Sequence, residues 1–110
     1  MTISADCRGG GDINTPDIES LFNSLQSRGG DRYLPSTSWV STTLGSARVC
    51  VYNNYIFENT HVSNWEIGWG VRSVREQCCF TPYCGGGTQQ GHGDSGLAVN
   101  IVTRSAGVAC

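Results

Sequence analysis

The sequence predicts an α+β fold: an α/β-sandwich in which two helices pack on one face of an antiparallel sheet, stapled by disulfides. Three observations support this prediction: one clearly amphipathic helical segment, several segments rich in β-branched and aromatic residues, and six cysteines in 110 residues. A chain of this length buries one modest core, so we expect residues 1–110 to form a single domain.

The first element is a helix near the N-terminus. Thr15 suits the N-cap, Pro16 suits the first helical position, and the first turn is acidic. Apolar residues then recur along one helical stripe, at Ile18, Leu21, Phe22 and Leu25. Gly29 ends the helix, because glycine is the residue most often found just beyond a helix C-terminus.

A β-hairpin is expected next. Residues 47–52 and 55–58 are rich in β-branched and aromatic types, and they flank Asn53-Asn54, a pair that tolerates the positive φ of a tight turn. A shorter strand around Trp39 and Val40 precedes this hairpin.

Residues 63–78 fit either a strand or a helix, since their apolar residues keep both spacings. We favour a helix because Ser63-Asn64-Trp65-Glu66 has the form of a capping box, although Gly68 and Gly70 each cost about 1 kcal/mol in a helix interior. Residues 96–103 alternate like a final strand. The glycine clusters at 9–11, 29–30, 85–87 and 91–96 are expected to mark loops.

The charges argue against nucleic-acid binding. Seven arginines, with no lysine, are spread among nine acidic residues for a net charge of −2, so no basic face is predicted. No apolar run reaches the roughly 20 residues that span a bilayer, and no transmembrane segment is expected. No charged-then-apolar leader is visible either, so we expect that an export leader is missing and that Met1 was added for expression.

The cysteine pattern predicts disulfides and therefore an extracellular location. Adjacent Cys78 and Cys79 cannot easily bridge each other, so we expect them to reach in opposite directions, with Cys7 pairing to Cys78. The pairing among Cys50, Cys79, Cys84 and Cys110 stays open. A zinc site is the alternative use of Cys78, Cys79, Cys84 and His92, but these residues lack the two-knuckle spacing of structural zinc sites. We expect no metal and no cofactor.

The string Gly93-Asp94-Ser95-Gly96 also surrounds the nucleophile of chymotrypsin-like serine proteases. A small serine hydrolase using Ser95 and His92 is therefore the alternative from another functional class, with His61 as the other possible base. The chemistry needs a base, an orienting carboxylate and an oxyanion hole on a scaffold about twice this size. We expect a glycine-rich turn and no enzyme.

Large exposed side chains are the candidates for a binding role. Core packing over the sheet is the default expectation for Trp39, Trp65 and Trp69, and the functional alternative is an exposed aromatic anchor, with Trp65 and Trp69 as the candidates. Arg48, two residues before Cys50, is by default a solvated surface arginine.

Four segments, taken in order, resemble the killer protein 4 family of fungal toxins: residues 6–9 (DCRG), 47–50 (ARVC), 97–102 (LAVNIV) and the C-terminal Cys110. The chain is similar, more faintly, to the extracellular protein 2 group of fungal effectors. The resemblance implies an α/β-sandwich, secretion by a fungus, and inhibition of competing cells by blocking calcium uptake at a channel. It also implies a role for a basic residue just before the mid-chain cysteine, which here is Arg48, whereas the family has lysine.

This chain departs from the family prototype, which has more cysteines and is markedly basic. The expected function is that of a secreted, cysteine-rich fungal toxin or effector, monomeric, that binds a surface protein of a target cell, with a calcium channel as the specific candidate. The alternative is a non-toxic effector that binds a host plant protein or wall polysaccharide. Arg48, Trp65 and Trp69 are the residues predicted to contact the target.

Overall fold

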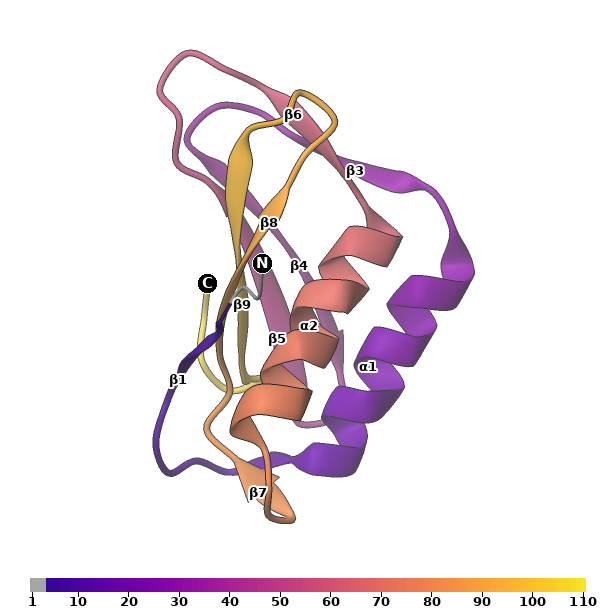
Figure 1. Ribbon diagram of the computed structural model, residues 1–110, viewed down its shortest axis with the longest axis vertical. Helices are drawn as coiled ribbons and strands as arrows, with labels where there is room; N and C mark the ends of the chain where they lie inside the picture. The colour runs from indigo at the N-terminus through magenta and orange to yellow at the C-terminus, as the bar shows by residue number, and fades with distance from the viewer. Residues whose placement is uncertain (1–3) are drawn as a thin grey trace.

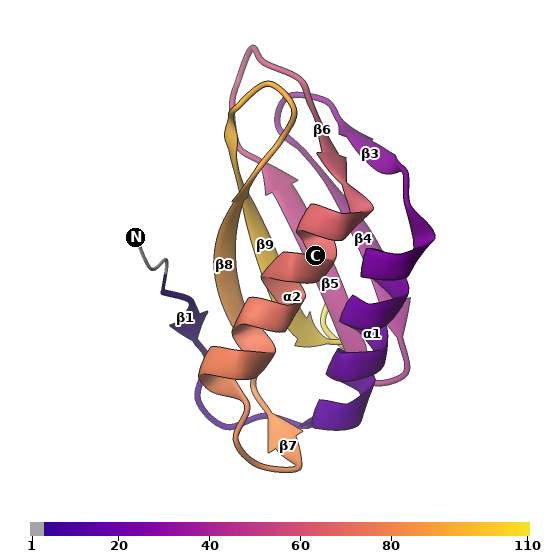
Figure 2. The same cartoon turned by 45° about the vertical axis from the view of Figure 1, so that its right-hand side comes forward.

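A computed structural model describes residues 4–110, so Met1 lies outside the described residues. Two helices, α1 (Thr15–Arg28) and α2 (Asn64–Cys78), lie side by side on one face of a five-stranded antiparallel sheet (Figures 1 and 2). The predicted α+β fold is confirmed. The sheet order is β1-β8-β9-β5-β4, with β1 at Asp6–Cys7, β8 at Gly87–His92, β9 at Ala98–Ser105, β5 at Ala47–Asn53 and β4 at Ser38–Leu44.

Two short antiparallel ladders complete the fold. β2 (Ile13–Asn14) pairs with β7 (Tyr83–Cys84) below the helices, and β3 (Asp31–Leu34) pairs with β6 (Thr60–Ser63) above them (Figure 1). The core lies between the helices and the sheet, where alternate strand residues meet the apolar stripes of both helices. Its fully buried members include Leu21, Leu25, Val49, Val51, Val71 and Ile101.

The helix α1 begins one residue earlier than expected, at Thr15. Asn14, not Thr15, occupies the N-cap position, so the predicted cap is wrong by one residue. Thr15 is buried, and its hydroxyl donates instead to the carbonyl of Thr81 at 2.7 Å. The hydroxyl of Thr15, which was predicted to cap α1, is therefore engaged in a contact with the loop after α2.

The helix α2 begins as predicted. Ser63 is the N-cap, and its Oγ accepts a hydrogen bond from the backbone N–H of Glu66 at 2.9 Å. The two interior glycines have a packing role, because a Cβ on Gly68 would lie 2.6 Å from Cγ of Gln26 in α1. A Cβ on Gly70 would lie 2.6 Å from Cγ2 of Ile101 in β9. Glycine lets α2 approach both α1 and the sheet.

The predicted hairpin is wrong. The strand β5 pairs with the preceding β4 through a turn at Gly45-Ser46, and residues 55–58 form no strand. The short strand expected around Trp39 is confirmed and is longer than expected, spanning Ser38–Leu44. Gly45, in this turn, has φ +57°, a backbone conformation that glycine adopts without strain. In the sheet, β5 therefore lies between β4 and β9 and pairs with both.

The glycine clusters are not all loops, contrary to expectation. Gly87 and Gly91 belong to β8, which sequence analysis missed entirely. A side chain at Gly91 would collide with Ile101, and one at Gly87 would collide with the carbonyl of Asp6 on β1. Close packing, not turning, requires glycine at these positions. The predicted final strand is confirmed as β9, shifted two residues toward the C-terminus.

All six cysteines are paired, so none is available as a zinc ligand. Cys7–Cys78 ties β1 to the end of α2, as predicted, and Cys78 and Cys79 do reach different partners. Cys79–Cys84 closes the loop after α2, and Cys50–Cys110 fastens the C-terminus to β5. Among residues 4–110, neither helix is long and apolar enough to cross a membrane.

Candidate binding surfaces

Arg48 lies on the outer face of the sheet, away from the helices. Its neighbours across the strands are Thr43 on β4 and Arg104 on β9. The Nε of Arg48 donates to Oγ1 of Thr43 at 3.1 Å, and Nη1 donates to the carbonyl of Val108 at 2.8 Å. Arg48 is thus a half-buried residue with structural partners, and not simply a solvated arginine.

The C-terminal tail, residues 106–110, is strapped to this face at several points. The Nη1 of Arg104 donates to the carbonyl of Ala109 at 2.8 Å, and the hydroxyl of Tyr52 donates to the carbonyl of Cys110 at 2.6 Å. The Cys50–Cys110 disulfide adds a covalent link. The tail therefore lies across the outer face and covers part of it.

The two arginines form a basic site within a slightly acidic chain. In the described part of the chain, the arginines that pair with carboxylates are Arg72, with Glu76, and Arg75, with Glu19. Arg48 and Arg104 instead donate to neutral carbonyl and hydroxyl oxygens, and neither forms an ion pair with a carboxylate among residues 4–110. Sequence composition could not reveal this pairing, because it depends on the register between β5 and β9.

Core packing was the wrong default for two of the three tryptophans. Trp39, on the outer side of β4 opposite Tyr52, is 53% exposed, and Trp65 is also 53% exposed. Trp69 is half-buried. Since α2 presents Gly68 and Gly70 to its neighbours, positions 65 and 69 face outward on the helix surface. The two predicted target-binding tryptophans are on one outward-facing side of α2, separate from Arg48.

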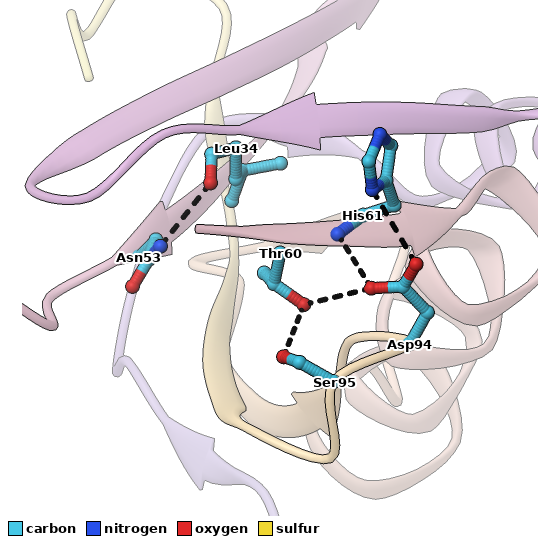
Figure 3. Close-up of polar contacts among 6 residues, drawn as sticks. All are labelled: Leu34, Asn53, Thr60, His61, Asp94 and Ser95. Atoms are coloured by element: carbon cyan, nitrogen blue, oxygen red, sulfur yellow. Dashed lines mark hydrogen bonds and ion pairs between the residues drawn. The ribbon is translucent and has the colours of Figure 1, made fainter. Parts of the chain in front are cut away.

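The Asp94-Ser95 loop between β8 and β9 packs against β6 (Figure 3). Asp94 accepts from the backbone N–H of His61 at 2.9 Å, and its other oxygen lies 3.4 Å from Nδ1 of His61. The Oγ of Ser95 donates to Oγ1 of Thr60 at 2.8 Å. Serine, histidine and aspartate are therefore close together, but the hydroxyl of Ser95 bonds to threonine, and the ring of His61 lies against Asp94 and the ring of Tyr33.

This arrangement orients no base toward Ser95. His92, the other candidate, lies on β8, where its backbone N–H donates to the carboxylate of Glu66 at 3.1 Å. The hydrogen bond from the His61 backbone lowers the pKa of Asp94 below its ordinary value of 3.8, with a smaller contribution from attraction to His61. The polar cluster thus fastens the loop after β8 onto β6.

Three consecutive exposed apolar side chains, among them the most exposed one of the described residues, belong to a segment that was predicted to be a strand. Residues 54–59, here called the aromatic loop, include Tyr55, Ile56 and Phe57, which are 39%, 68% and 92% exposed. Three consecutive large apolar residues lack the alternation of a half-buried strand, and asparagines flank them on both sides. That pattern was the available signal for an apolar loop.

A comparison with known proteins finds no family model that matches this chain and no curated protein significantly similar in sequence.

Proposed function

We propose that this protein is a secreted toxin or effector that acts by binding a target on other cells. The observation that carries the proposal is the disulfide framework: three bridges pair every cysteine, and they join β1 to the end of α2, the C-terminal tail to β5, and the two sides of the loop after α2. Disulfide-dense small domains are typical of proteins that work in oxidising surroundings outside the cell. Such a framework keeps the surface free for recognition.

The resemblance to the killer protein 4 family makes the proposal more specific. The matched motifs contain the cysteines Cys7, Cys50 and Cys110, and all three are bridged here. Arg48, in the motif position of the family's basic residue, shares an uncompensated basic site with Arg104. A cationic group of this kind suits an acidic site on a target, such as the mouth of a cation channel.

Growth inhibition tests the proposal directly. Purified protein, with three bridges verified by intact mass before and after reduction, is applied to fungal and plant cells while calcium uptake is recorded. We expect slowed growth and reduced uptake in at least one susceptible species. Normal growth and uptake in all of them at micromolar doses would contradict the toxin assignment.

Two further outcomes would separate the alternatives. Tight binding to a host protein or wall polysaccharide without growth inhibition would support a non-toxic plant-interacting effector. Labelling of Ser95 by a serine-reactive fluorophosphonate would instead require an activated nucleophile, which the contact between Ser95 and Thr60 gives no reason to expect.

A further inference from the structure

The aromatic loop forms one end of the molecule. The protein measures 39 × 29 × 25 Å, and the loop joining β5 to β6 is the outermost segment along the long axis in both views (Figures 1 and 2). Ile56 and Phe57 belong to this outermost segment, whereas Tyr55 also lines a pocket with Gln90 and Asn100. A flat surface could meet this end without touching the rest of the protein.

The exposed side chains of the loop and of the neighbouring strand β4 differ in polarity and in exposure. Phe57 and Ile56, which have no polar atoms, are the most exposed, at 92% and 68%. Tyr55 and Trp39, which combine an aromatic ring with one polar group, are less exposed, at 39% and 53%. Purely apolar residues in the loop, with Trp39 on the strand β4 close to the base of the loop, are the residue types found at the interface of a bilayer.

The loop is held in shape from below by the buried side chain of Asn53 (Figure 3). Its Nδ2 donates to the carbonyls of Glu58 at 2.8 Å and Leu34 at 3.2 Å, and its Oδ1 accepts from the N–H of Tyr55 at 3.0 Å. The N–H of Thr37 donates to the carbonyl of Tyr55, also at 3.0 Å. These bonds satisfy backbone groups that would otherwise be costly to remove from water.

We propose that the aromatic loop anchors this protein to the interface of a lipid bilayer. A protein partner normally supplies about one hydrogen bond per 100–200 Å² of interface. The polar groups at the base of this loop are already paired internally, and mainly apolar carbon is turned outward. That chemistry fits a lipid phase, which offers no hydrogen-bond partners, better than it fits a protein surface.

The charge of the aromatic loop indicates which type of bilayer it would bind. Between Tyr52 and Thr60 the only ionisable side chain besides Tyr52 and Tyr55 is that of Glu58, and no arginine or lysine is present to attract anionic lipid. Binding should therefore favour neutral, zwitterionic membranes and depend little on salt. This behaviour is opposite to that of a basic membrane-binding patch.

Vesicle binding tests the anchor. In a Trp65→Phe/Trp69→Phe background, Trp39 is the only fluorophore of its kind, so its emission reports on the loop. With vesicles of phosphatidylcholine we expect a blue shift and quenching by brominated acyl chains, and weaker binding when phosphatidylserine is added. Phe57→Ala should lower the partition coefficient about tenfold to a hundredfold, because it removes most of one phenylalanine from the apolar phase.

Phe80 provides a matched control. It is 79% exposed and lies between α2 and β7, at the end of the molecule opposite the aromatic loop (Figure 1). Phe80→Ala should leave vesicle binding unchanged, and Phe57→Leu should retain most of it. Equal losses from Phe57→Ala and Phe80→Ala would overturn the proposal, as would the absence of any binding by the parent protein.

The test does not depend on the toxin assignment, because vesicles contain no receptor. Phe57-dependent binding to intact cells, without binding to vesicles made from the same cells' lipids, would overturn the lipid anchor in favour of a protein partner. Vesicle binding without any effect on cells would support the lipid anchor and contradict only the toxin proposal.

Discussion

Arg48 on β5 and Arg104 on β9 lie directly opposite each other, and each donates a 2.8 Å hydrogen bond to a backbone carbonyl of the C-terminal tail. Like charges facing each other across strands are destabilising. The carbonyls of Val108 and Ala109 offset this repulsion, and the Cys50–Cys110 disulfide keeps them in place. The basic site and the tail are therefore one structural unit.

Replacing Arg48 by glutamate should remove biological activity with little change in stability. The substitution loses the bonds to Val108 and Thr43 but converts a like-charge pair with Arg104 into an opposite-charge pair, so we expect the free energy of unfolding to change by only about 1 kcal/mol. Growth inhibition and urea denaturation measure the two effects. Arg104→Glu is the matched control, and equal loss of activity in both variants would point to the charge of the site rather than to Arg48.

The three disulfides should differ in their contribution to stability. Chain entropy predicts that removing Cys7–Cys78 or Cys50–Cys110, which span 71 and 60 residues, costs about 4 kcal/mol each. Removing Cys79–Cys84, which spans 5 residues, should cost about 2 kcal/mol. Paired cysteine-to-serine variants and urea denaturation test this order. A larger loss from the short bridge than from either long one would contradict it.

Asp17 should make the protein sensitive to acid. Hydrogen bonds from the hydroxyl and then the backbone N–H of Ser46 lower the pKa of Asp17 below its ordinary value of 3.8. A carboxylate whose pKa is lowered by folding stabilises the protein above the unfolded-state value, and this stability is lost as the pH falls through the lower, folded-state value. We expect the thermal midpoint to fall as the pH drops below about 4.

Asp17→Asn provides the comparison. It keeps the shape of the side chain but removes the charge that links α1 to the turn between β4 and β5, so its midpoint should be lower near neutral pH and fall less in acid. Some acid dependence should remain, because the pKa of Asp94 is also lowered. Parallel curves for the parent and the variant would exclude Asp17 as a source of the acid sensitivity.

Gly70→Ala should destabilise the protein although alanine is the better helix former. The added Cβ would lie 2.6 Å from Cγ2 of Ile101, so either the side chain of Ile101 or α2 itself must shift, at a cost of roughly 1–3 kcal/mol. Ile101→Ala in the same chain should make the two losses less than additive in a double-mutant cycle. Gly9→Ala is the control, since a Cβ there meets nothing within 4 Å.

Much of the local structure could be predicted from the chain. The apolar stripe of α1, the Ser63 cap of α2 and the alternation of β9 all depend on neighbours within a few residues, and the structure confirms each of them. The strand β8 was not predicted because it consists of glycine, threonine, glutamine and histidine, and these residues show no alternation of apolar and polar types. Its glycines are needed by partners on other elements, which the local pattern does not contain.

The candidate surfaces were less predictable than the fold. Trp65 was among the residues predicted to contact a target and is exposed, whereas Trp39, which is equally exposed, and the aromatic loop were not among them. Tyr55, Ile56 and Phe57 have high strand propensity, so their composition predicted a hairpin. The buried side chain of Asn53 overrides that propensity by bonding to the carbonyls of Leu34, Pro35 and Glu58, which diverts the chain away from the sheet.

Periodicity, capping and cysteine content determined from the sequence alone that this is a disulfide-stapled domain with two helices and an antiparallel sheet. Only the tertiary structure decided which strands pair, which tryptophans face water, how Arg48 meets Arg104, and which cysteines join beyond Cys7 and Cys78. The reason is the range of the interactions. Helix stripes and caps involve residues a few positions apart, whereas strand register, close glycine packing and disulfide closure join residues that only folding brings together.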